Sequence, residues 1–269
     1  MWRVLMEAMR LVCLILILGA TGALAAPCPA PKTLAFVVAK TLHRDKPGFT
    51  EGLEIDHGAL LESTGDVFGD SGINRIDLKT GHVETLLDAG QRYFGEGLSA
   101  LDGKLYQMTY REHRVFVFDT HFKPLGEMTN PREGWGLTHD ATRLIASDGS
   151  DTLFYLSPTD FSTLGELPVR DHGQPVRNLN ELEYVHGAIW ANVFEAWTVL
   201  KIAPQTGCVL AKADISNLRG HMTPAERAQI GRDPNFVPNG IAWDEASSQF
   251  ILTGKFWPVL FFGQFVEIN

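Results

Sequence analysis

The chain has 269 residues, of which 32 are acidic and 23 basic, so its formal net charge is −9. Hydrophobic residues make up 45% of the chain, which excludes an intrinsically disordered protein. The acidic balance gives no basic face of the kind that nucleic-acid-binding proteins carry, so we expect no nucleic-acid partner.

Residues 1–25 have the pattern of a cleaved secretory signal. Arg3 and Arg10 precede a short apolar run over residues 11–18, and the segment ends in Ala-Leu-Ala. A membrane-spanning helix needs about 20 apolar residues, more than this run contains, although an uncleaved anchor stays the alternative. We expect cleavage here, one domain over residues 26–269, a periplasmic or secreted protein, and no membrane association after cleavage.

Two cysteines remain beyond the expected signal, Cys28 and Cys208. Two cysteines in an exported chain can form a disulfide. Because Cys28 lies in a proline-rich leader, two free thiols are the alternative. Their spacing excludes a CxxC metal site. The nine histidines show no HExxH or HxH spacing, so we expect no catalytic metal and no cofactor. A structural ion on loop carboxylates stays open.

Five segments of the remaining chain resemble one another. They are Phe49-Thr50-Glu51-Gly52-Leu53, Phe94-Gly95-Glu96-Gly97-Leu98, Gly134-Trp135-Gly136-Leu137, Asn180-Glu181-Leu182-Glu183 and Pro238-Asn239-Gly240-Ile241. Short apolar runs follow each segment around turn signals such as Asp102-Gly103 and His186-Gly187. Three or four strands per unit, repeated about every 40–50 residues, are typical of a β-propeller. We expect an all-β, five-bladed β-propeller, with an open sandwich of two sheets as the alternative.

The last interval of the repeat is longer than the others, and a short helix explains the extra residues. Within residues 222–231, Thr223 has the features of an N-cap, Pro224 those of the first helical position and Glu226 those of the capping-box partner. We also expect the apolar run over residues 34–40 to supply the outer strand that closes the last blade beside the C-terminal residues 261–268.

The repeat also predicts a central pocket, because the innermost strands of all blades begin near the channel of a propeller. The pocket then gathers aromatic and polar side chains from distant parts of the chain: Phe49, Glu51, Phe94, Glu96, Trp135, Asn180 and Glu181. Aromatic walls with a few polar groups suit a small, uncharged part of a ligand, although each ring could instead pack between blades. A buried Glu96 is harder to explain by packing, because burying a carboxylate costs free energy.

At this point the sequence resembles the glutaminyl-peptide cyclotransferases of the plant-latex and bacterial type, over roughly residues 49–258. Besides the repeat segments, the matching stretches include Glu62-Ser63-Thr64-Gly65, Lys104-Leu105-Tyr106-Gln107, Ser147-Asp148-Gly149, Trp190-Ala191-Asn192 and Thr253-Gly254-Lys255-Phe256-Trp257-Pro258. The resemblance implies a five-bladed propeller that converts the N-terminal glutamine of peptides or proteins into pyroglutamate and releases ammonia. We further expect a monomer.

The resemblance also implies roles for individual residues. The proposed catalytic glutamate of the family falls on Glu96, and the other pocket positions fall on Phe49, Phe94, Trp135, Asn180 and Lys255. Three positions depart from the family pattern. Glu51 stands where the family usually has glutamine, and Phe194 and Tyr110 stand where it usually has tryptophan. The two aromatic changes keep the pocket wall, whereas Glu51 adds a possible charge.

The chemistry explains why such residues are needed. Ring closure requires a held rotamer, a neutral amine and proton transfer, and one carboxylate can take the amine proton and deliver it to the leaving ammonia. An aromatic pocket would raise the pKa of Glu96, which suits this role. Asn180 and Lys255 are candidate oxyanion donors, although they could instead be a turn residue and a surface cation. Gly95 and Gly97 would let a substrate approach the backbone closely.

Two other functions compete with this interpretation. A lactonase-type propeller hydrolase would hold a divalent metal on central side chains, for which Glu51, Glu96, Asn180, Glu181 and Asn239 are the candidates. A non-catalytic periplasmic binding module would have the pocket without the proton-shuttle glutamate. The string Gly69-Asp70-Ser71-Gly72 copies a serine-protease sequence, but no convincing partner histidine accompanies it.

Overall fold

Strands provide nearly all the regular structure of the protein, which we describe from a computed structural model covering residues 28–65 and 69–268. The expected signal over residues 1–25 therefore lies outside the described residues. Three four-stranded antiparallel sheets follow one another along the chain. The first contains β2 (Thr50–Asp56), β3 (Ala59–Thr64), β4 (Gly72–Ile76) and β5 (Val83–Asp88). The second contains β6 (Gly95–Leu101), β7 (Lys104–Thr109), β8 (Arg114–Asp119) and β9 (Pro124–Thr129). The third contains β10 (Leu137–His139), β11 (Leu144–Ala146), β12 (Thr152–Leu156) and β13 (Thr163–Pro168).

An eight-stranded sheet completes the structure, and it consists of two four-stranded halves. One half contains β16 (Leu179–Val185), β17 (Ala188–Val193), β18 (Thr198–Ile202) and β19 (Val209–Asp214). The other contains β20 (Pro238–Asp244), β21 (Gln249–Gly254), β22 (Val259–Glu267) and β1 (Lys32–His43). The halves join where β1 runs parallel to β19. A two-stranded hairpin, β14 (Arg170–Asp171) with β15 (Gln174–Pro175), lies between the third sheet and β16.

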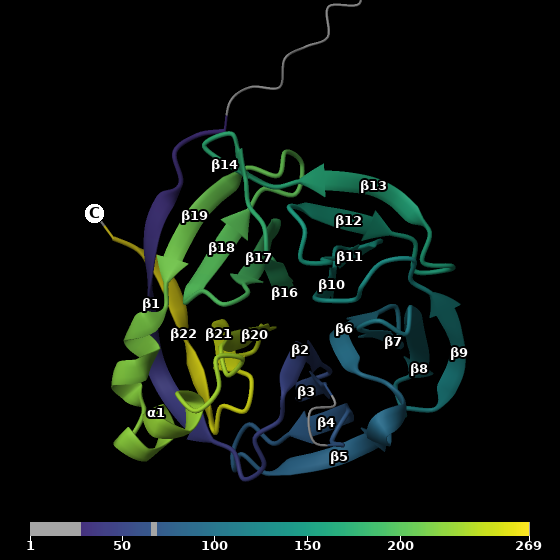
Figure 1. Cartoon of the computed structure of the whole chain (residues 1–269), viewed down its shortest axis with the longest axis horizontal. Coiled ribbons are helices and arrows are strands. Elements are labelled where there is room, and N and C mark those ends of the chain that lie inside the picture. Colours follow the sequence, from purple (N-terminus) through teal and green to yellow (C-terminus); the bar gives the residue numbers. More distant parts are fainter. Residues whose placement is uncertain (1–27, 66–68, 269) are drawn as a thin grey trace, which may run out of the picture.

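The groups of strands are arranged side by side around a common centre (Figure 1). The strand nearest the centre in each group contacts its counterparts on both sides, in the closed order β2, β6, β10, β16, β20 and back to β2. The chain is therefore all-β in its main structure, as predicted. The alternative of an open two-sheet sandwich is wrong, because the strands form more than two sheets around one centre.

The predicted closure by the N-terminal run is confirmed. Strand β1 pairs antiparallel with β22 from Leu34 opposite Glu267 to His43 opposite Val259, so the two ends of the described chain share one sheet. The parallel pairing of β1 with β19 was not predicted, and it makes the N-terminal strand a bridge between two groups of strands.

The turn signals behave as the sequence predicted. Asp102 and Gly103 have φ angles of 51° and 70°, and His186 and Gly187 have φ angles of 48° and 78°. Positive φ at both central residues matches the twist of a two-residue antiparallel hairpin. These turns connect the first and second strands of their groups, so they fix the register in which each innermost strand pairs with the next strand outward.

The predicted helical insertion is confirmed as α1 (Pro224–Ile230). Thr223 Oγ1 accepts the backbone N–H of Glu226, and the Glu226 carboxylate accepts the backbone N–H of Thr223, which completes the capping box. Two short 3-10 segments, η1 (Gly90–Arg92) and η2 (Ser216–His221), are the other helical elements of the described residues. None of these helices has the length and apolar composition that a membrane span needs.

Cys28 and Cys208 form a disulfide, with their Cα atoms 5.3 Å apart and 180 residues between them in sequence. Of the two possibilities that the sequence left open, pairing is therefore the one observed. Cys208 immediately precedes β19, so the bridge fastens the segment before β1 to the group that β1 also contacts.

Buried carboxylates complete the hydrogen bonding of the innermost strands. Glu181 accepts the backbone N–H groups of Leu53 at 3.1 Å and Ile241 at 2.7 Å, and so joins three strands around the centre. Glu183 accepts the N–H of Trp243 at 2.9 Å in the same way. An unpaired buried N–H would cost free energy, so these side chains stabilise the central ring.

The buried position of Glu183 predicts an unusual dependence of stability on pH. Burial raises the pKa of Glu183 to about 8. Hydrogen bonds from the N–H of Trp243 and the hydroxyl of Thr138 lower the pKa, but their effect is smaller than that of burial. Burial also raises the pKa of Glu54, and the charge of Glu183 raises it further. The folded state then binds more protons than the unfolded state. We expect the free energy of unfolding to fall between about pH 5 and pH 8, by up to about 1.4 kcal/mol per pH unit for one carboxyl.

Urea denaturation at pH 5, 6, 7 and 8 measures this slope. Glu183→Gln should flatten it, whereas Glu166→Gln on the exposed face of β13 should leave it unchanged. A slope that is the same in all three proteins would mean that Glu183 is ionised in the folded protein at pH 5.

Candidate active site

A cavity of about 140 Å³ lies at the centre of the ring of strands. Its lining consists of Phe49, Glu51, Phe94, Glu96, Tyr110, Trp135, Asn180, Phe194 and Lys255. The structure brings together these nine residues, all of which the sequence predicted for the site. The predicted pocket also included Glu181, which does not line the cavity, because its carboxylate accepts the backbone N–H groups of Leu53 and Ile241. Lys255 and Asn180 are 6% and 2% exposed, so Lys255 is not a surface cation.

The lining residues occupy equivalent places in their groups. Phe49 and Phe94 immediately precede innermost strands, and Trp135 lies two residues before β10. Tyr110, Phe194 and Lys255 directly follow the second strands. Neighbouring antiparallel strands run in opposite directions, so the start of one lies beside the end of the next. All these residues therefore lie on the same face of the ring.

A β-bulge recurs where the polar lining residues lie. Pairing skips Glu51 between Thr50 and Gly52, and similar shifts occur over residues 95–98, 179–182 and 238–241. An extra residue in one strand re-aims its side chain and is common next to active sites. The repeat seen in the sequence is thus a repeated bulge, which turns Glu51, Glu96 and Asn180 toward the centre.

The glycines beside Glu96 have a different role from the one predicted. A Cβ atom on Gly97 would lie 2.4 Å from the backbone nitrogen of Leu137, and one on Gly95 would lie 2.7 Å from the carbonyl oxygen of Thr64. At both glycines the space that a side chain would occupy is filled by other parts of the protein, so the expectation that they let a substrate approach is wrong. They let neighbouring strands pack closely enough for the lining residues to meet.

Glu51 and Lys255 form a buried ion pair. Lys255 Nζ donates to Glu51 Oε1 at 2.8 Å, and Asn239 Nδ2 donates to Glu51 Oε2 at 3.2 Å. The ammonium also lies 4.7 Å from the ring centroid of Phe49 and 5.2 Å from that of Phe194. Cation–π contacts of this kind favour a charged ammonium in an otherwise apolar position. Burial raises the pKa of Glu51, and the charge of Lys255 opposes that shift.

Among the described residues Glu96 forms no ion pair, and its environment favours the protonated form. Burial raises the pKa of Glu96 well above its ordinary value, the charge of Glu51 raises it further, and the charge of Lys255 lowers it. A buried carboxyl group whose pKa is raised in this way is suited to general acid–base chemistry.

Two buried polar atoms of the lining lack a hydrogen-bond partner within the described residues: Trp135 Nε1 and Asn180 Oδ1. Buried polar atoms in proteins are nearly always paired, so an unpaired donor and acceptor in one cavity point to a ligand. The cavity therefore contains a hydrogen-bond donor in Trp135, an acceptor in Asn180, the carboxyl group of Glu96 and the cation of Lys255, all between aromatic rings.

A second buried ion pair supports the site and was missed by the sequence analysis. The Arg44 guanidinium donates to Glu62 and to the carbonyl oxygen of Trp257, and Thr50 Oγ1 donates to Glu62 at 2.6 Å. These contacts hold the start of β2, which carries Phe49 and Glu51. Arg44 follows β1 and Glu62 lies in β3, with β2 between them in the sequence, so no local sequence signal links them.

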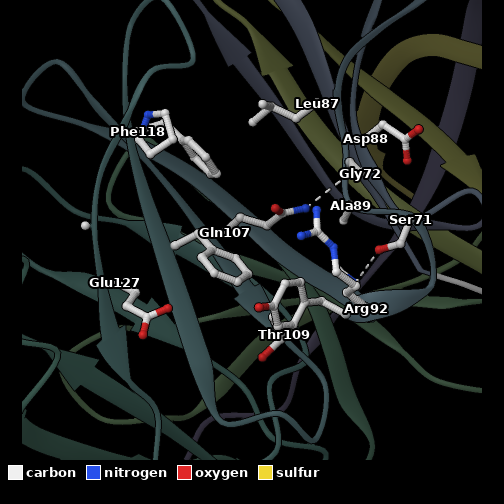
Figure 2. Close-up of a pocket in the computed structure, with 15 residues that line it drawn as sticks. Ser71, Gly72, Leu87, Asp88, Ala89, Arg92, Gln107, Thr109, Phe118 and Glu127 are labelled. Carbon is white, nitrogen blue, oxygen red and sulfur yellow. Dashed lines mark hydrogen bonds between the residues drawn. The ribbon is translucent and has the colours of Figure 1, made fainter.

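A larger cavity, of about 410 Å³, lies away from these residues between the first and second sheets (Figure 2). Two of its polar side chains, Gln107 and Ser71, already have hydrogen-bond partners. Gln107 Nε2 donates to Ser63 Oγ at 2.8 Å and to the carbonyl oxygen of Gly72 at 3.1 Å. Ser71, the serine of the protease-like string, donates to the carbonyl oxygen of Thr64 and accepts the N–H of Gly95. Ser71 therefore has a structural role between strands.

Among residues 28–65 and 69–268, no three His, Cys, Asp or Glu side chains are grouped so that they could hold a metal ion. The central glutamates have other surroundings: Glu181 accepts backbone N–H groups, Glu51 accepts from Lys255, and Glu96 lines the cavity.

Comparison with known proteins agrees with this arrangement. The profile of the glutamine cyclotransferase family matches residues 11–265. The chain belongs to this family. A glutaminyl-peptide cyclotransferase of Arabidopsis thaliana is 38% identical over 231 residues, which are 84% of this chain and 69% of the relative. The crystal structure of Myxococcus xanthus glutaminyl cyclase superposes with a TM-score of 0.78 at 31% identity, covering 89% of this chain and 100% of the other.

Membership of the glutamine cyclotransferase family makes the central cavity the candidate site of the reaction. The predicted resemblance is confirmed, and it was carried by the same repeat segments that build the cavity lining. The lining residues differ from the family pattern stated for the sequence mainly at Glu51, whose carboxylate is paired with Lys255.

Proposed function

We propose that this protein is a glutaminyl-peptide cyclotransferase that converts N-terminal glutamine into pyroglutamate, with Glu96 as the proton shuttle. Family membership and the glutaminyl-peptide cyclotransferase at 38% identity support the activity. The observation that carries the proposal is the convergence of Glu96, Asn180 and Lys255 in one aromatic cavity. The cavity, of about 140 Å³, suits a single small side chain more than an extended ligand.

The reaction is a balanced acyl transfer within one residue. The neutral α-amine attacks the side-chain carboxamide carbon, and Glu96 as a carboxylate accepts the proton that the amine loses. Glu96 as a carboxylic acid then donates that proton to the departing amide nitrogen, which leaves as ammonia. The shuttle ends in the state in which it began, so one carboxyl group suffices.

The remaining lining residues have roles that follow from their contacts. Lys255 and Trp135 Nε1 are donors for the oxyanion that develops on the carboxamide oxygen, and Asn180 Oδ1 accepts a hydrogen from the substrate. The rings of Phe49, Phe94 and Phe194 exclude water and hold the side chain in the conformation required for ring closure.

The fold is a five-bladed β-propeller in this proposal. Its support is the closed ring of innermost strands and the four-stranded group that follows each of them outward. The mature protein is a single domain over residues 26–269 that is exported to the periplasm or secreted and acts as a monomer. The Cys28–Cys208 disulfide supports export, because such bonds persist in oxidising compartments.

One experiment separates this function from its competitors. The purified protein is incubated with a glutamine-initiated peptide, and ammonia release and the loss of one ammonia from the peptide are measured. A lactonase would instead open lactones and lose activity on treatment with a chelator. A binding module would retain the peptide unchanged.

Glu51→Gln is expected to keep activity within about tenfold of the parent and to move the acidic limb of the pH profile to lower pH. The charge of Glu51 raises the pKa of Glu96, so removing that charge lets Glu96 stay ionised in more acidic solution. Measurement of kcat/KM from pH 5 to pH 9 tests this. An unchanged profile would mean that Glu51 does not influence the proton shuttle.

A further inference from the structure

A second cleft, of about 510 Å³, opens beside the active-site cavity. One wall is the helical insertion with the segment that leads from it into β20, and the other is the turn after β17. Its lining includes Glu195, Trp197, Arg219, Arg227, Asp233 and Phe236. The segment after α1 leads to Val237, which lines the cleft and whose carbonyl oxygen accepts the backbone N–H of Lys255, a residue of the site, at 3.0 Å. The cleft therefore lies beside the site.

The two cavities are lined by neighbouring residues. Phe194 lines the active-site cavity and the next residue, Glu195, lines the cleft. On the other side, the Phe256 ring lies 5.2 Å from that of Phe49 in the site and 5.0 Å from that of Phe236 in the cleft. The Phe49 and Phe236 rings are thus no more than about 10 Å apart, a distance that about three residues of extended peptide span at ~3.3 Å each.

Arg219 gives the cleft a positioned cation. Its guanidinium lies 4.2 Å from the ring centroid of Trp197, which stacks on Trp257 at 5.1 Å. Within the described residues Arg219 forms no ion pair, whereas Arg227 donates to the carbonyl oxygens of Arg219 and Met222. A guanidinium held over an indole ring presents its donors as a planar fork that matches a carboxylate.

The acidic groups of the cleft do not neutralise this cation. Asp233 Oδ1 accepts the backbone N–H of Asn235 and so caps a turn of the insertion. Glu195 lies on an exposed turn with a φ of 63° and forms no ion pair among the residues that the structure describes.

We propose that this cleft holds the substrate residues that follow the N-terminal glutamine, and that Arg219 binds a carboxylate on the third or fourth of them. The inference rests on the proposed cyclotransferase activity and names its preferred substrates, which are peptides with an acidic residue shortly after glutamine. A free C-terminal carboxylate on a short peptide presents the same chemistry at the same distance.

The test compares amidated peptides that differ at one position: Gln-Ala-Glu-Ala, Gln-Ala-Gln-Ala and Gln-Ala-Lys-Ala, with a second set that carries the variable residue at position four. Tripeptides with free and amidated C-termini distinguish a side-chain carboxylate from a terminal one. Glutamine amide, which cannot reach the cleft, reports the chemistry alone. We expect the parent enzyme to show a KM about threefold to tenfold lower for the glutamate peptides than for their glutamine counterparts.

Arg219→Gln should abolish this difference and leave kcat and KM for glutamine amide unchanged. Arg232→Gln, at an exposed arginine of the insertion outside the cleft lining, is the matched control and should keep the preference. Equal KM values for the parent enzyme, a preference for lysine peptides, or the same behaviour in both variants would overturn the inference while the cyclotransferase activity stands. No ammonia from any substrate, glutamine amide included, would overturn the proposed function itself.

Discussion

Glu96→Gln is expected to lower the turnover of glutamine-initiated peptides by about 10²–10⁴-fold, with little change in KM or in thermal stability. General acid–base catalysis contributes a rate factor of this size, equivalent to roughly 3–5 kcal/mol of activation barrier. The glutamine side chain keeps the shape and reach of glutamate but cannot accept the amine proton. Glu96 is 5% exposed, and no side chain of residues 28–65 and 69–268 depends on it for an ion pair, so the fold should tolerate the change.

The measurement is single-turnover and steady-state ammonia release, with thermal unfolding recorded on the same preparations. Glu166→Gln makes the same substitution on an exposed outer strand and should behave as the parent. If Glu96→Gln cyclises glutamine at close to the parent rate, Glu96 is not the shuttle. The catalytic group would then have to be sought among the other titratable residues of the lining, Glu51 first.

The sequence predicted much of the site because the site is a repeated structure. Three polar lining residues, Glu51, Glu96 and Asn180, occupy bulges of innermost strands, so aligning the similar segments also aligned these residues. The hairpin turns, the capping box and the closing strand were predictable for a similar reason, since each depends on residues close in sequence or on a simple apolar pattern.

Contacts between distant segments were not predictable in this way. Glu51 and Lys255 are 204 residues apart, and only closure of the ring brings them within 2.8 Å of each other. The close approach of Gly97 to Leu137 depends on the spacing of two neighbouring groups, which no motif in either strand specifies. The parallel pairing of β1 with β19 likewise depends on the distance between two neighbouring groups of strands in the closed ring.

Lys255→Met is expected to lower kcat/KM by about 10²–10³-fold and to destabilise the fold. Removal of a donor aimed at a developing oxyanion has an effect of this size. The variant also leaves the Glu51 carboxylate, which is only 2% exposed, without its cation. Breaking one side of a buried ion pair costs about 3–5 kcal/mol. Glu51 would bind a proton to reduce that cost, so the loss of stability should be smaller at pH 5 than at pH 8.

The double variant Glu51→Gln with Lys255→Met separates the two effects of the lysine. It removes both charges, and a neutral glutamine beside methionine leaves no unpaired carboxylate, so urea denaturation should show most of the lost stability restored. Turnover should stay as low as in Lys255→Met, because the oxyanion donor is still missing. Recovery of turnover together with stability would instead mean that Lys255 acts only by neutralising Glu51, and that Trp135 Nε1 stabilises the oxyanion without it. That result would make the Glu51–Lys255 pair a substitute for the neutral glutamine that the family pattern has at this position, and would remove Lys255 from the chemical step.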